Sequence, residues 1–354
     1  MSVTIASLAT RLIRVPLTRP WGPDVTELGV IETVVTDSDG ATGYGFSWTP
    51  TIGAASVQAL LDQEITAFAV GRPTDAAELW PALWRHLHEA GGGGITTIAM
   101  AGLDLALWDL AGRRAGTSVV DLVGRTQETA EVYGSGVNLH YPLAELVAQA
   151  ERWVAAGYDA VKVKVGSPDL ARDVERLAAL REVLGPDRRL MIDANQRWNL
   201  DRATAALEAF TPFAPAWIEE PLRADDLPAH AELRRRTDVP IALGENVHTR
   251  YRFAEFLDAG LVDVAQPNIV RVGGITPFRE IVALADGYGV QVAPHLLFEL
   301  SGQLALTLPR PTLVEDVEDA TFSALGALSG PAPVSVDGAR LSFDPVPGLG
   351  LRFA

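Results

Sequence analysis

Apolar and polar positions follow two alternating rhythms along the second part of the chain. From about residue 132, short apolar runs alternate with longer segments whose apolar residues recur at helical spacing, as in residues 144–156 and 170–184. Eight strands with helices between them are typical of a closed parallel α/β barrel, which we predict here. The predicted strands are residues 132–138, 160–166, 189–193, 216–219, 240–245, 262–267, 290–294 and 312–315.

The first third of the chain has a different pattern. Residues 4–15, 30–35 and 42–48 favour strands, and Asp39-Gly40 predicts a tight hairpin turn between the last two. Helical periodicity follows over residues 54–68, 76–88 and 95–115. Three antiparallel strands followed by helices predict an α+β unit ahead of the barrel.

Acidic residues stand at the ends of three successive predicted strands. Asp193, Glu219 and Glu245 each follow an apolar run, and equal steps of 26 residues separate them. If these strands are parallel neighbours, the three carboxylates converge and raise each other's pKa. A divalent cation would remove the repulsion, and ligation by oxygen alone favours a hard ion such as Mg²⁺.

The second predicted strand carries two lysines, in the run Val161-Lys-Val-Lys-Val165. Alternation places Lys162 and Lys164 on one side of the strand and the valines on the other. Solvated lysines on an exposed strand would also fit, but the strand is central in the count, so we predict that both lysines point into the barrel. Two adjacent ammonium groups near a metal are expected to have lowered pKa values, which suits a base.

The last three strands also end in polar residues. They deliver Asn268, His295 and Glu315 in turn. A single histidine is more often structural, but His295 at a strand end would face Lys164 across the barrel mouth. We therefore predict that these residues belong to the same site as the lysines and the three acids.

Composition narrows the class of protein. The chain has 354 residues and a net charge of −16, which argues against a nucleic-acid or anionic-membrane partner. It has no cysteine, so disulfides and thiolate metal ligands are excluded. The apolar segment 95–111 carries Asp104 and Asp109, so we interpret it as a buried helix rather than a membrane span. Residues 1–14 show no signal-peptide pattern.

Several short motifs together resemble the enolase superfamily. They are Lys-x-Lys (162–164), Asp-Ala-Asn (193–195), Ile-Glu-Glu-Pro (218–221), Gly-Glu-Asn (244–246), Gly-Gly-Ile-Thr (273–276), a late Pro-His (294–295), residues 101–109 and Pro-Gly-Leu-Gly (347–350). A Glu as third ligand together with the late His is similar to the mandelate racemase-like subgroup. The resemblance implies a modified (β/α)7β barrel at residues 126–324. It also implies an α+β cap at residues 1–125 and 325–354, with loops near residues 17–26 and 46–52 closing the site.

The resemblance also implies roles for these residues. Mg²⁺ on Asp193, Glu219 and Glu245 would hold a substrate carboxylate while the proton beside it is removed. Lys164 would be the base, Lys162 would neutralise the carboxylate, and His295 would be an acid or base on the opposite face. Glu315 would donate a hydrogen bond to the enediolate, which requires it to be protonated.

One position departs from the family pattern, because Gln266-Pro267 is followed by Asn268 where the subgroup has Asp. Asn268 can still bond to His295, but it carries no charge and supports an imidazolium less well. A symmetric two-base racemase is therefore disfavoured. Lys164 as base with His295 as acid fits β-elimination of water from a sugar acid.

We therefore predict a Mg²⁺-dependent acid-sugar dehydratase. A racemase or epimerase, a lactone cycloisomerase, and a non-catalytic relative that binds metal and ligand stay open. We expect a small carboxylate substrate, a cytoplasmic homo-oligomer, and no nucleic-acid or membrane partner. The expected substrate contacts are Asn195, Trp198, Asn138, His248, Trp21 and Trp48.

Overall fold

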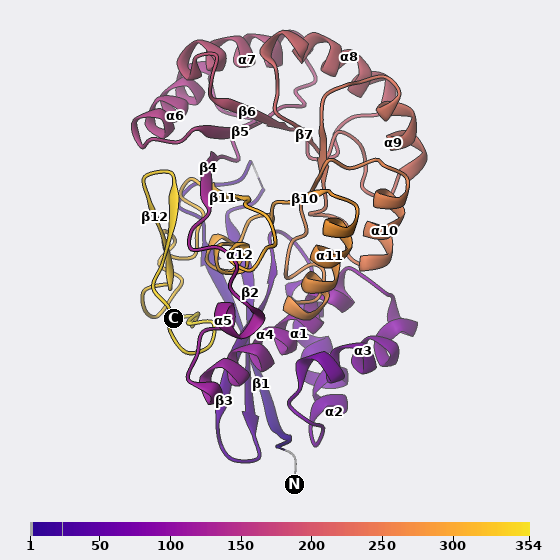
Figure 1. The fold of residues 1–354 in the computed structure, drawn as a ribbon, viewed down its shortest axis with the longest axis vertical. Coiled ribbons are helices and arrows are strands. Elements are labelled where there is room, and N and C mark those ends of the chain that lie inside the picture. Colours follow the sequence, from indigo (N-terminus) through magenta and orange to yellow (C-terminus); the bar gives the residue numbers. More distant parts are fainter. Residues whose placement is uncertain (1–2, 23) are drawn as a thin grey trace.

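The protein has two parts, which lie toward opposite ends of its longest axis (Figure 1). This computed structural model describes residues 3–22 and 24–354. The smaller part, called the cap below, contains the N-terminal strands and the first helices, and the larger part is a barrel of parallel strands surrounded by helices. The predicted combination of an α/β barrel and an α+β cap is confirmed.

The cap sheet consists of the three antiparallel strands that the sequence pattern predicts, in the order β1–β2–β3. Their bounds are β1 (Ile5–Pro16), β2 (Glu27–Asp37) and β3 (Thr42–Thr49). Strand β3 lies directly on helix α4 (Ile95–Ala115). A Cβ on Gly45 would come within 2.3 Å of the Gly102 carbonyl oxygen, and one on Gly43 within 2.2 Å of the Ala106 carbonyl oxygen. Only glycine allows this close approach of strand and helix.

The cap helices also follow the predicted segments. They are α1 (Ala54–Leu60), α2 (Thr66–Ala69), α3 (Ala76–Leu87), α4 and α5 (Val119–Val123). A π-helical turn, Leu61–Ile65, joins α1 to α2, so the helix predicted at 54–68 is continuous. Within the described chain, α4 is the one helix long and apolar enough to cross a bilayer, but 78% of its most apolar window is buried inside the protein. The interpretation of α4 as a buried helix is confirmed.

All eight predicted barrel strands are present, and hydrogen-bonded neighbours run parallel. They are β4 (Glu131–Ser135), β5 (Ala160–Lys164), β6 (Arg189–Asp193), β7 (Ile218–Glu219), β8 (Ile241–Leu243), β9 (Val264–Ala265), β10 (Gln291–Val292) and β11 (Leu313–Val317). Strand β11 pairs with β4, which brings the two ends of the series together. Several strands are shorter than predicted because their last residues leave the ladder to form the loops of the barrel mouth.

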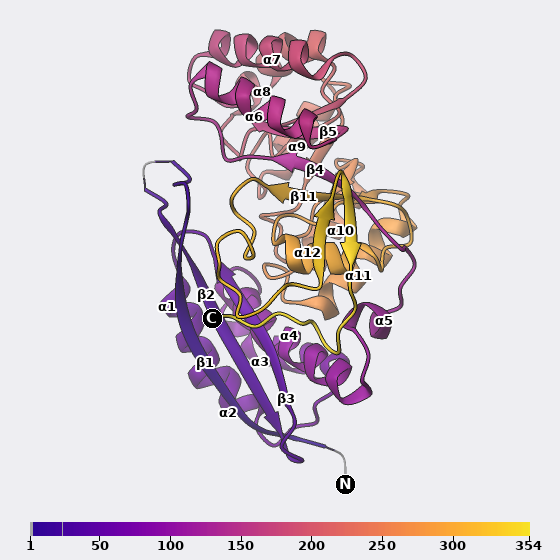
Figure 2. The same ribbon diagram turned by 90° about the vertical axis from the view of Figure 1, so that its left-hand side faces the viewer.

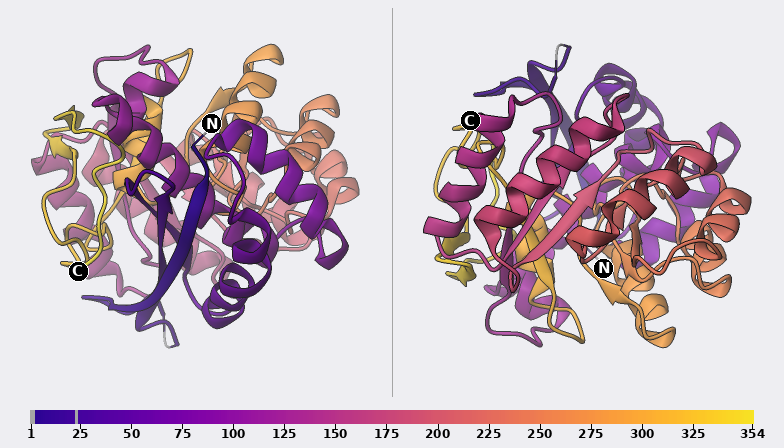
Figure 3. Two further views of the ribbon diagram at one scale, coloured as in Figure 1. Left: turned by 90° about the horizontal axis from the view of Figure 1, so that it is seen from below. Right: turned by 90° about the horizontal axis from the view of Figure 1, so that it is seen from above.

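A helix follows each of the first seven barrel strands, and these helices form an arc around the strands (Figure 3). They are α6 (Leu143–Ala155), α7 (Leu170–Leu184), α8 (Leu200–Phe210), α9 (Leu227–Arg234), α10 (Arg250–Asp258), α11 (Ile275–Gly287) and α12 (Phe298–Ala305). In the described chain, β11 is followed instead by the hairpin of β12 (Val334–Asp337) and β13 (Arg340–Phe343). The fold is therefore the expected (β/α)7β form.

The barrel interior is a separate apolar layer with one side chain from each strand or its edge. Its members are Tyr133, Ala160, Met191, Trp217, Ala242, Val264, Ala293 and Leu313. Val161 and Val163 belong instead to the core between the strands and the helices. Strand β5 thus has its valines outside the barrel and its lysines inside, as the alternation predicts.

The C-terminal segment contacts both parts of the protein. Its β12–β13 hairpin joins the barrel sheet where Arg340 pairs with Glu131. The final residues then run beside the cap sheet (Figure 2), where Arg11 donates a hydrogen bond of 3.2 Å to the Phe353 carbonyl oxygen. The grouping of residues 325–354 with the cap stays a prediction, because the hairpin lies on the barrel and only the tail reaches the cap.

Candidate active site

The polar residues predicted at the strand ends gather at one end of the barrel. Lys162 and Lys164 lie on β5, and Asp193 and Glu219 end β6 and β7. The others follow or lie on the remaining strands: Glu245 after β8, Asn268 after β9, His295 after β10 and Glu315 on β11. Because parallel strands end at the same edge of a barrel, one constellation forms from segments far apart in the sequence.

Lys162 is enclosed by carboxylates. Its Nζ lies 2.8 Å from Glu219 Oε1 and 2.7 Å from Glu315 Oε1, and its side chain is 1% exposed. Burial alone would lower the pKa of this ammonium, but the charges of Glu219 and Glu315 hold it well above its usual value. Lys162 is therefore a fixed positive charge.

Lys164 lies one pleat further toward the barrel mouth, where its Nζ forms an ion pair with Asp193. Its backbone N–H donates to Asn138 Oδ1 at 2.9 Å. Burial lowers the pKa of Lys164, but the negative charges of Asp193, Glu219 and Glu245 together outweigh it, so the net shift is upward. The expected lowering of both lysine pKa values near a metal stays a prediction, because here carboxylates rather than a metal lie against the ammonium groups. These are also the only two lysines in the chain.

Glu219 and Glu245 form a group with His295 in which one ligand atom from each residue lies within 4.8 Å of the others. Glu219 also accepts a hydrogen bond of 2.7 Å from Gln266 Nε2. Asp193, the third predicted ligand, accepts the Asn195 N–H at 2.8 Å through one oxygen and pairs with Lys164 through the other. Two of the three predicted ligands, Glu219 and Glu245, thus lie together with His295, and the third, Asp193, is engaged by Lys164.

The charges in this group leave room for a divalent cation. Five buried carboxylates, those of Asp193, Glu219, Glu220, Glu245 and Glu315, face three permanent cations, Lys162, Lys164 and Arg271. Burial and the neighbouring acids raise the pKa of Glu219 to about 7, and burial and Glu245 raise that of Glu220 well above its usual value. Oxygen donors with this charge deficit fit Mg²⁺.

Glu315 is surrounded by hydrogen-bond donors. Its carboxylate accepts hydrogen bonds from Ser135 Oγ at 2.7 Å and from the Leu296 N–H at 3.0 Å, and it pairs with Lys162. Burial would raise the pKa of Glu315, but the charge of Lys162 above all lowers it to about 2. A protonated Glu315 that donates a hydrogen bond to the enediolate stays a prediction, which requires this arrangement of donors to change when substrate and cation bind.

His295 lies between an amide and an acid. Its Nδ1 is 3.1 Å from Asn268 Nδ2, and its Nε2 is 2.5 Å from Glu245 Oε2. The predicted contact between Asn268 and His295 is confirmed. The contact with Glu245 could not be predicted from the sequence, because it depends on how far the two loops after β8 and β10 reach over the barrel.

A cavity of about 170 Å³ opens above these residues. Its polar side includes Lys164, Asn195, Glu245, His295 and Glu315, and its apolar side includes Trp21, Trp48 and Pro50 from the cap, with Val137, Leu296 and Val317 from the barrel. Trp21, Trp48 and Asn195 therefore lie where predicted substrate contacts should be. Residue 23, in the predicted closing loop at 17–26, lies outside the described residues.

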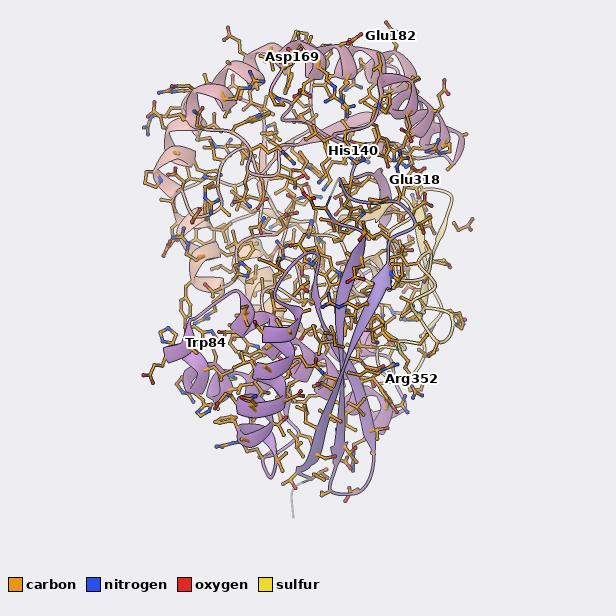
Figure 4. All side chains as sticks on the ribbon, turned by 180° about the vertical axis from the view of Figure 1, so that it is seen from behind. Trp84, His140, Asp169, Glu182, Glu318 and Arg352 are labelled. Carbon is orange, nitrogen blue, oxygen red and sulfur yellow. The ribbon has the colours of Figure 1, made fainter. Side chains whose placement is uncertain are left out.

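The barrel side anchors this cap loop through residues near the labelled His140, which lies beyond the end of the cap strands in Figure 4. Arg19 places its guanidinium 3.6 Å from the centre of the Tyr141 ring and pairs with Glu145. The contacts of Arg19 with Tyr141 and Glu145 thus hold Trp21, two residues further on, close to the barrel mouth.

Three other predicted substrate contacts do not line this cavity. Asn138 is fully buried and bonds to Gln149 Oε1 at 2.8 Å and to the Lys164 backbone, so it supports β5. Trp198 is buried beside Phe210. His248 lines a second cavity of about 470 Å³, together with Gly92–Gly94, Arg223 and Arg252. For Asn138 and Trp198 the predicted substrate contact is wrong, because both side chains turn into the protein core.

Ser135 and Arg271 line the cavity but were not predicted. Arg271 Nη1 donates to the Glu245 carbonyl oxygen at 2.9 Å and to Asn246 Oδ1 at 2.5 Å. Asn246 in turn donates to both Glu220 oxygens at 2.8 and 2.9 Å. The available sequence signal was the position of Arg271 three residues after Asn268, in the loop that leads to Gly273-Gly274.

Two family models match the chain. The mandelate racemase/muconate lactonizing enzyme N-terminal domain matches residues 13–124, and the enolase C-terminal domain-like model matches residues 145–354. The chain belongs to the enolase superfamily, in the mandelate racemase-like subgroup. The resemblance inferred from the motifs is thereby confirmed.

The names of several similar proteins refer to sugar acids. The chain is 38% identical over 316 residues to 3,6-anhydro-α-L-galactonate cycloisomerase of Streptomyces coelicolor, covering 88% of each chain. It is 32% identical to L-talarate/galactarate dehydratase of Salmonella typhimurium, covering 90% of this chain and 80% of that one. The crystal structure of L-talarate dehydratase from Polaromonas sp. JS666 with Mg and L-glucarate matches with a TM-score of 0.89 and 34% identity, over 100% and 96% of the two chains.

Proposed function

We propose that this enzyme removes the proton α to the carboxylate of a sugar acid and expels the oxygen at the β carbon, most simply as water. The observation that carries the proposal is that Lys164 and His295 line one cavity from β5 and β10. Strands β4 and β11 separate β5 from β10 on one side of the barrel, and four strands separate them on the other. A base and an acid thus approach the substrate from different directions.

We propose Asp193, Glu219 and Glu245 as the Mg²⁺ ligands. The charge deficit among the buried acids and the oxygen donors support this assignment. The bound ion supplies positive charge against which negative charge developing on the substrate carboxylate is stabilised. Lys162, fixed between Glu219 and Glu315, adds a second positive charge beneath the same place.

The proton transfers balance without an oxidant or a reductant. Lys164 Nζ, once neutral, takes the α-proton, and the electron pair of that C–H bond forms a double bond to the β carbon as the β C–O bond breaks. His295 supplies a proton to the departing oxygen. The resulting enol becomes the 2-keto acid by moving a proton from oxygen to carbon.

A cycloisomerase is the second candidate, and the apolar wall of the cavity favours it. Trp21, Trp48, Pro50, Val137 and Leu296 offer little hydrogen bonding to a chain with many hydroxyl groups, but they suit the C–H face of a ring. In that case the departing oxygen belongs to a ring of the substrate and stays in the product. The same base and acid serve both reactions.

The proposal is tested by incubating the protein and Mg²⁺ with linear aldonates and aldarates, with anhydro-sugar acids and with sugar-acid lactones. A dehydratase yields a 2-keto acid lighter than the substrate by one water, whereas a cycloisomerase yields a product of unchanged mass. Epimerisation of the α carbon would indicate the racemase alternative. Mg²⁺ and acid binding without turnover of any member of the panel would contradict the proposal and favour a binding protein.

A further inference from the structure

The orientation of the Asn268 amide is fixed by two neighbours other than His295. Asn268 is fully buried in the loop after β9. Its Oδ1 accepts the Arg271 backbone N–H at 3.0 Å, and its Nδ2 lies 3.5 Å from the His295 carbonyl oxygen. A backbone N–H can only donate and a backbone carbonyl can only accept, so these contacts together decide which end of the amide is oxygen.

This orientation presents a donor to the imidazole. Asn268 Nδ2 is 3.1 Å from His295 Nδ1, and an amide NH₂ group can only donate at that contact. Nδ1 must then offer its lone pair, which places the proton of a neutral imidazole on Nε2. The other side of the ring agrees, because Nε2 faces the Glu245 carboxylate, an acceptor, at 2.5 Å.

An aspartate in the place of Asn268 would impose the opposite arrangement. A carboxylate accepts a hydrogen bond from Nδ1–H, which leaves Nε2 with a lone pair and able to remove a proton. The exchange of one oxygen for NH₂ therefore reverses the direction of hydrogen bonding along the ring.

We propose that Asn268 is a positioning residue that holds His295 as the Nε2–H tautomer, so that His295 gives a proton to the substrate and takes none from it. Its catalytic consequence rests on the proposed function: Lys164 is the only base, and only the α-proton on the Lys164 face is removed. The tautomer itself is a property of the protein and can be measured without a substrate.

The first test is ¹⁵N NMR of histidine-labelled protein, with and without Mg²⁺, in which protonated and unprotonated ring nitrogens have distinct shifts. A His295→Gln variant assigns the signals among the six histidines of the chain. We expect Nε2 protonated in the wild type and Nδ1 protonated in Asn268→Asp. Asn199→Asp, the same change at the exposed cap of α8, is the matched control and should leave the His295 signals unmoved.

The second test is exchange of the substrate α-proton in D₂O for sugar acids of both α configurations. We expect the wild type to exchange one configuration only and Asn268→Asp to gain exchange of the other. A wild-type ring with its proton on Nδ1, an unchanged tautomer in Asn268→Asp, or wild-type exchange at both configurations would overturn the inference. If no sugar acid exchanges at all, the proposed function fails, while the NMR result still decides the tautomer.

Discussion

At the scale of single residues, the site is governed by which charge faces which. Lys162 and Lys164 lie two residues apart on β5, yet Lys162 has two carboxylate partners of its own while Lys164 has Asp193. Both pKa shifts are upward, but only Lys164 lines the cavity. Of the two, Lys164 is therefore the one that we propose as the base, once the charge of Asp193 is taken up by another partner.

Lys164→Ala should reduce exchange of the substrate α-proton with D₂O by about 10²- to 10⁴-fold, the usual contribution of a general base. Lys164→Arg keeps the positive charge beside Asp193 but cannot lose its proton, so it should fail equally. Exchange followed by ¹H NMR is the measurement. Wild-type exchange in Lys164→Arg would show that charge rather than basicity matters at this position.

Glu219→Gln should weaken Mg²⁺ binding by more than the roughly 10- to 100-fold typical of changing a residue that only supports a ligand. Calorimetry gives the affinity directly. The chain has only two lysines, so ¹³C-lysine NMR adds a second readout, in which Mg²⁺ should shift the Lys164 signal of the wild type. Glu255→Gln, at an exposed acid on α10, is the control and should bind Mg²⁺ normally. Unchanged affinity in Glu219→Gln would remove Glu219 from the ligand set.

At the scale of elements, one buried acid connects the cap to the barrel. Asp104 of α4 accepts the Thr276 backbone N–H at 3.0 Å, at the first turn of α11. Trp108, one helical turn further along α4, donates from Nε1 to Thr276 Oγ1 at 3.0 Å. The residue that precedes α11 is Gly274, which has no side chain to accept a hydrogen bond from the first turn of the helix. Asp104, from the cap domain, supplies this acceptor instead.

This position should make stability depend on pH. Burial raises the pKa of Asp104 from 3.8 to about 7 despite its hydrogen bonds with Thr276. The folded protein therefore binds this proton more tightly than the unfolded chain does. The resulting stabilisation is complete below about 3.8, disappears as the pH rises through about 7, and amounts to at most about 4 kcal/mol.

Asp104→Asn should remove this dependence. The free energy of unfolding is measured by urea denaturation at a pH between 3.8 and about 7 and again above about 7. As the pH rises, this free energy should fall more in the wild type than in the variant. Asp201→Asn, at an exposed acid on α8, should change with pH like the wild type. Parallel pH profiles for the wild type and Asp104→Asn would show that Asp104 is ionised throughout.

At the scale of the whole molecule, the cap and the barrel share the catalytic cavity and must keep a fixed relation. Trp21 and Trp48 come from the cap, and the reacting groups come from the barrel. The C-terminal tail helps to hold the two together. Phe353 lies 5.2 Å from Phe46 of β3 and 5.0 Å from Phe322, measured between ring centres. Phe46, the first residue of the closing loop expected near residues 46–52, is thus part of β3 and of a core contact.

Phe353→Ala should cost about 3–5 kcal/mol of unfolding free energy, the range for removing a buried phenylalanine. Urea denaturation measures it, and Phe353→Leu should cost less because it fills most of the space. Ile52→Ala, at a side chain that is 84% exposed, should change stability by no more than about 0.5 kcal/mol. A cost for Phe353→Ala as small as that of Ile52→Ala would mean that the tail does not contribute to folding.

The sequence by itself determined the elements and the order in which they carry polar residues. Strand and helix periods are local properties, so eight strands, the buried helix α4 and the inward lysines of β5 could be predicted from spacing. The equal steps between Asp193, Glu219 and Glu245 predicted that all three would lie at one edge of the barrel, because parallel strands end at one edge.

Only the tertiary structure decided the state and the direction of each polar group. The Glu315 carboxylate pairs with Lys162 and accepts hydrogen bonds from Ser135 and the Leu296 N–H. Asn138 supports β5 because Gln149 and the Lys164 N–H hold it. These partners come from distant parts of the chain, and a hydrogen bond depends on distances that no local period encodes. The physical reason is that the pKa of a buried group depends on the charges and hydrogen-bond partners next to it, and these neighbours are brought together only when the chain folds.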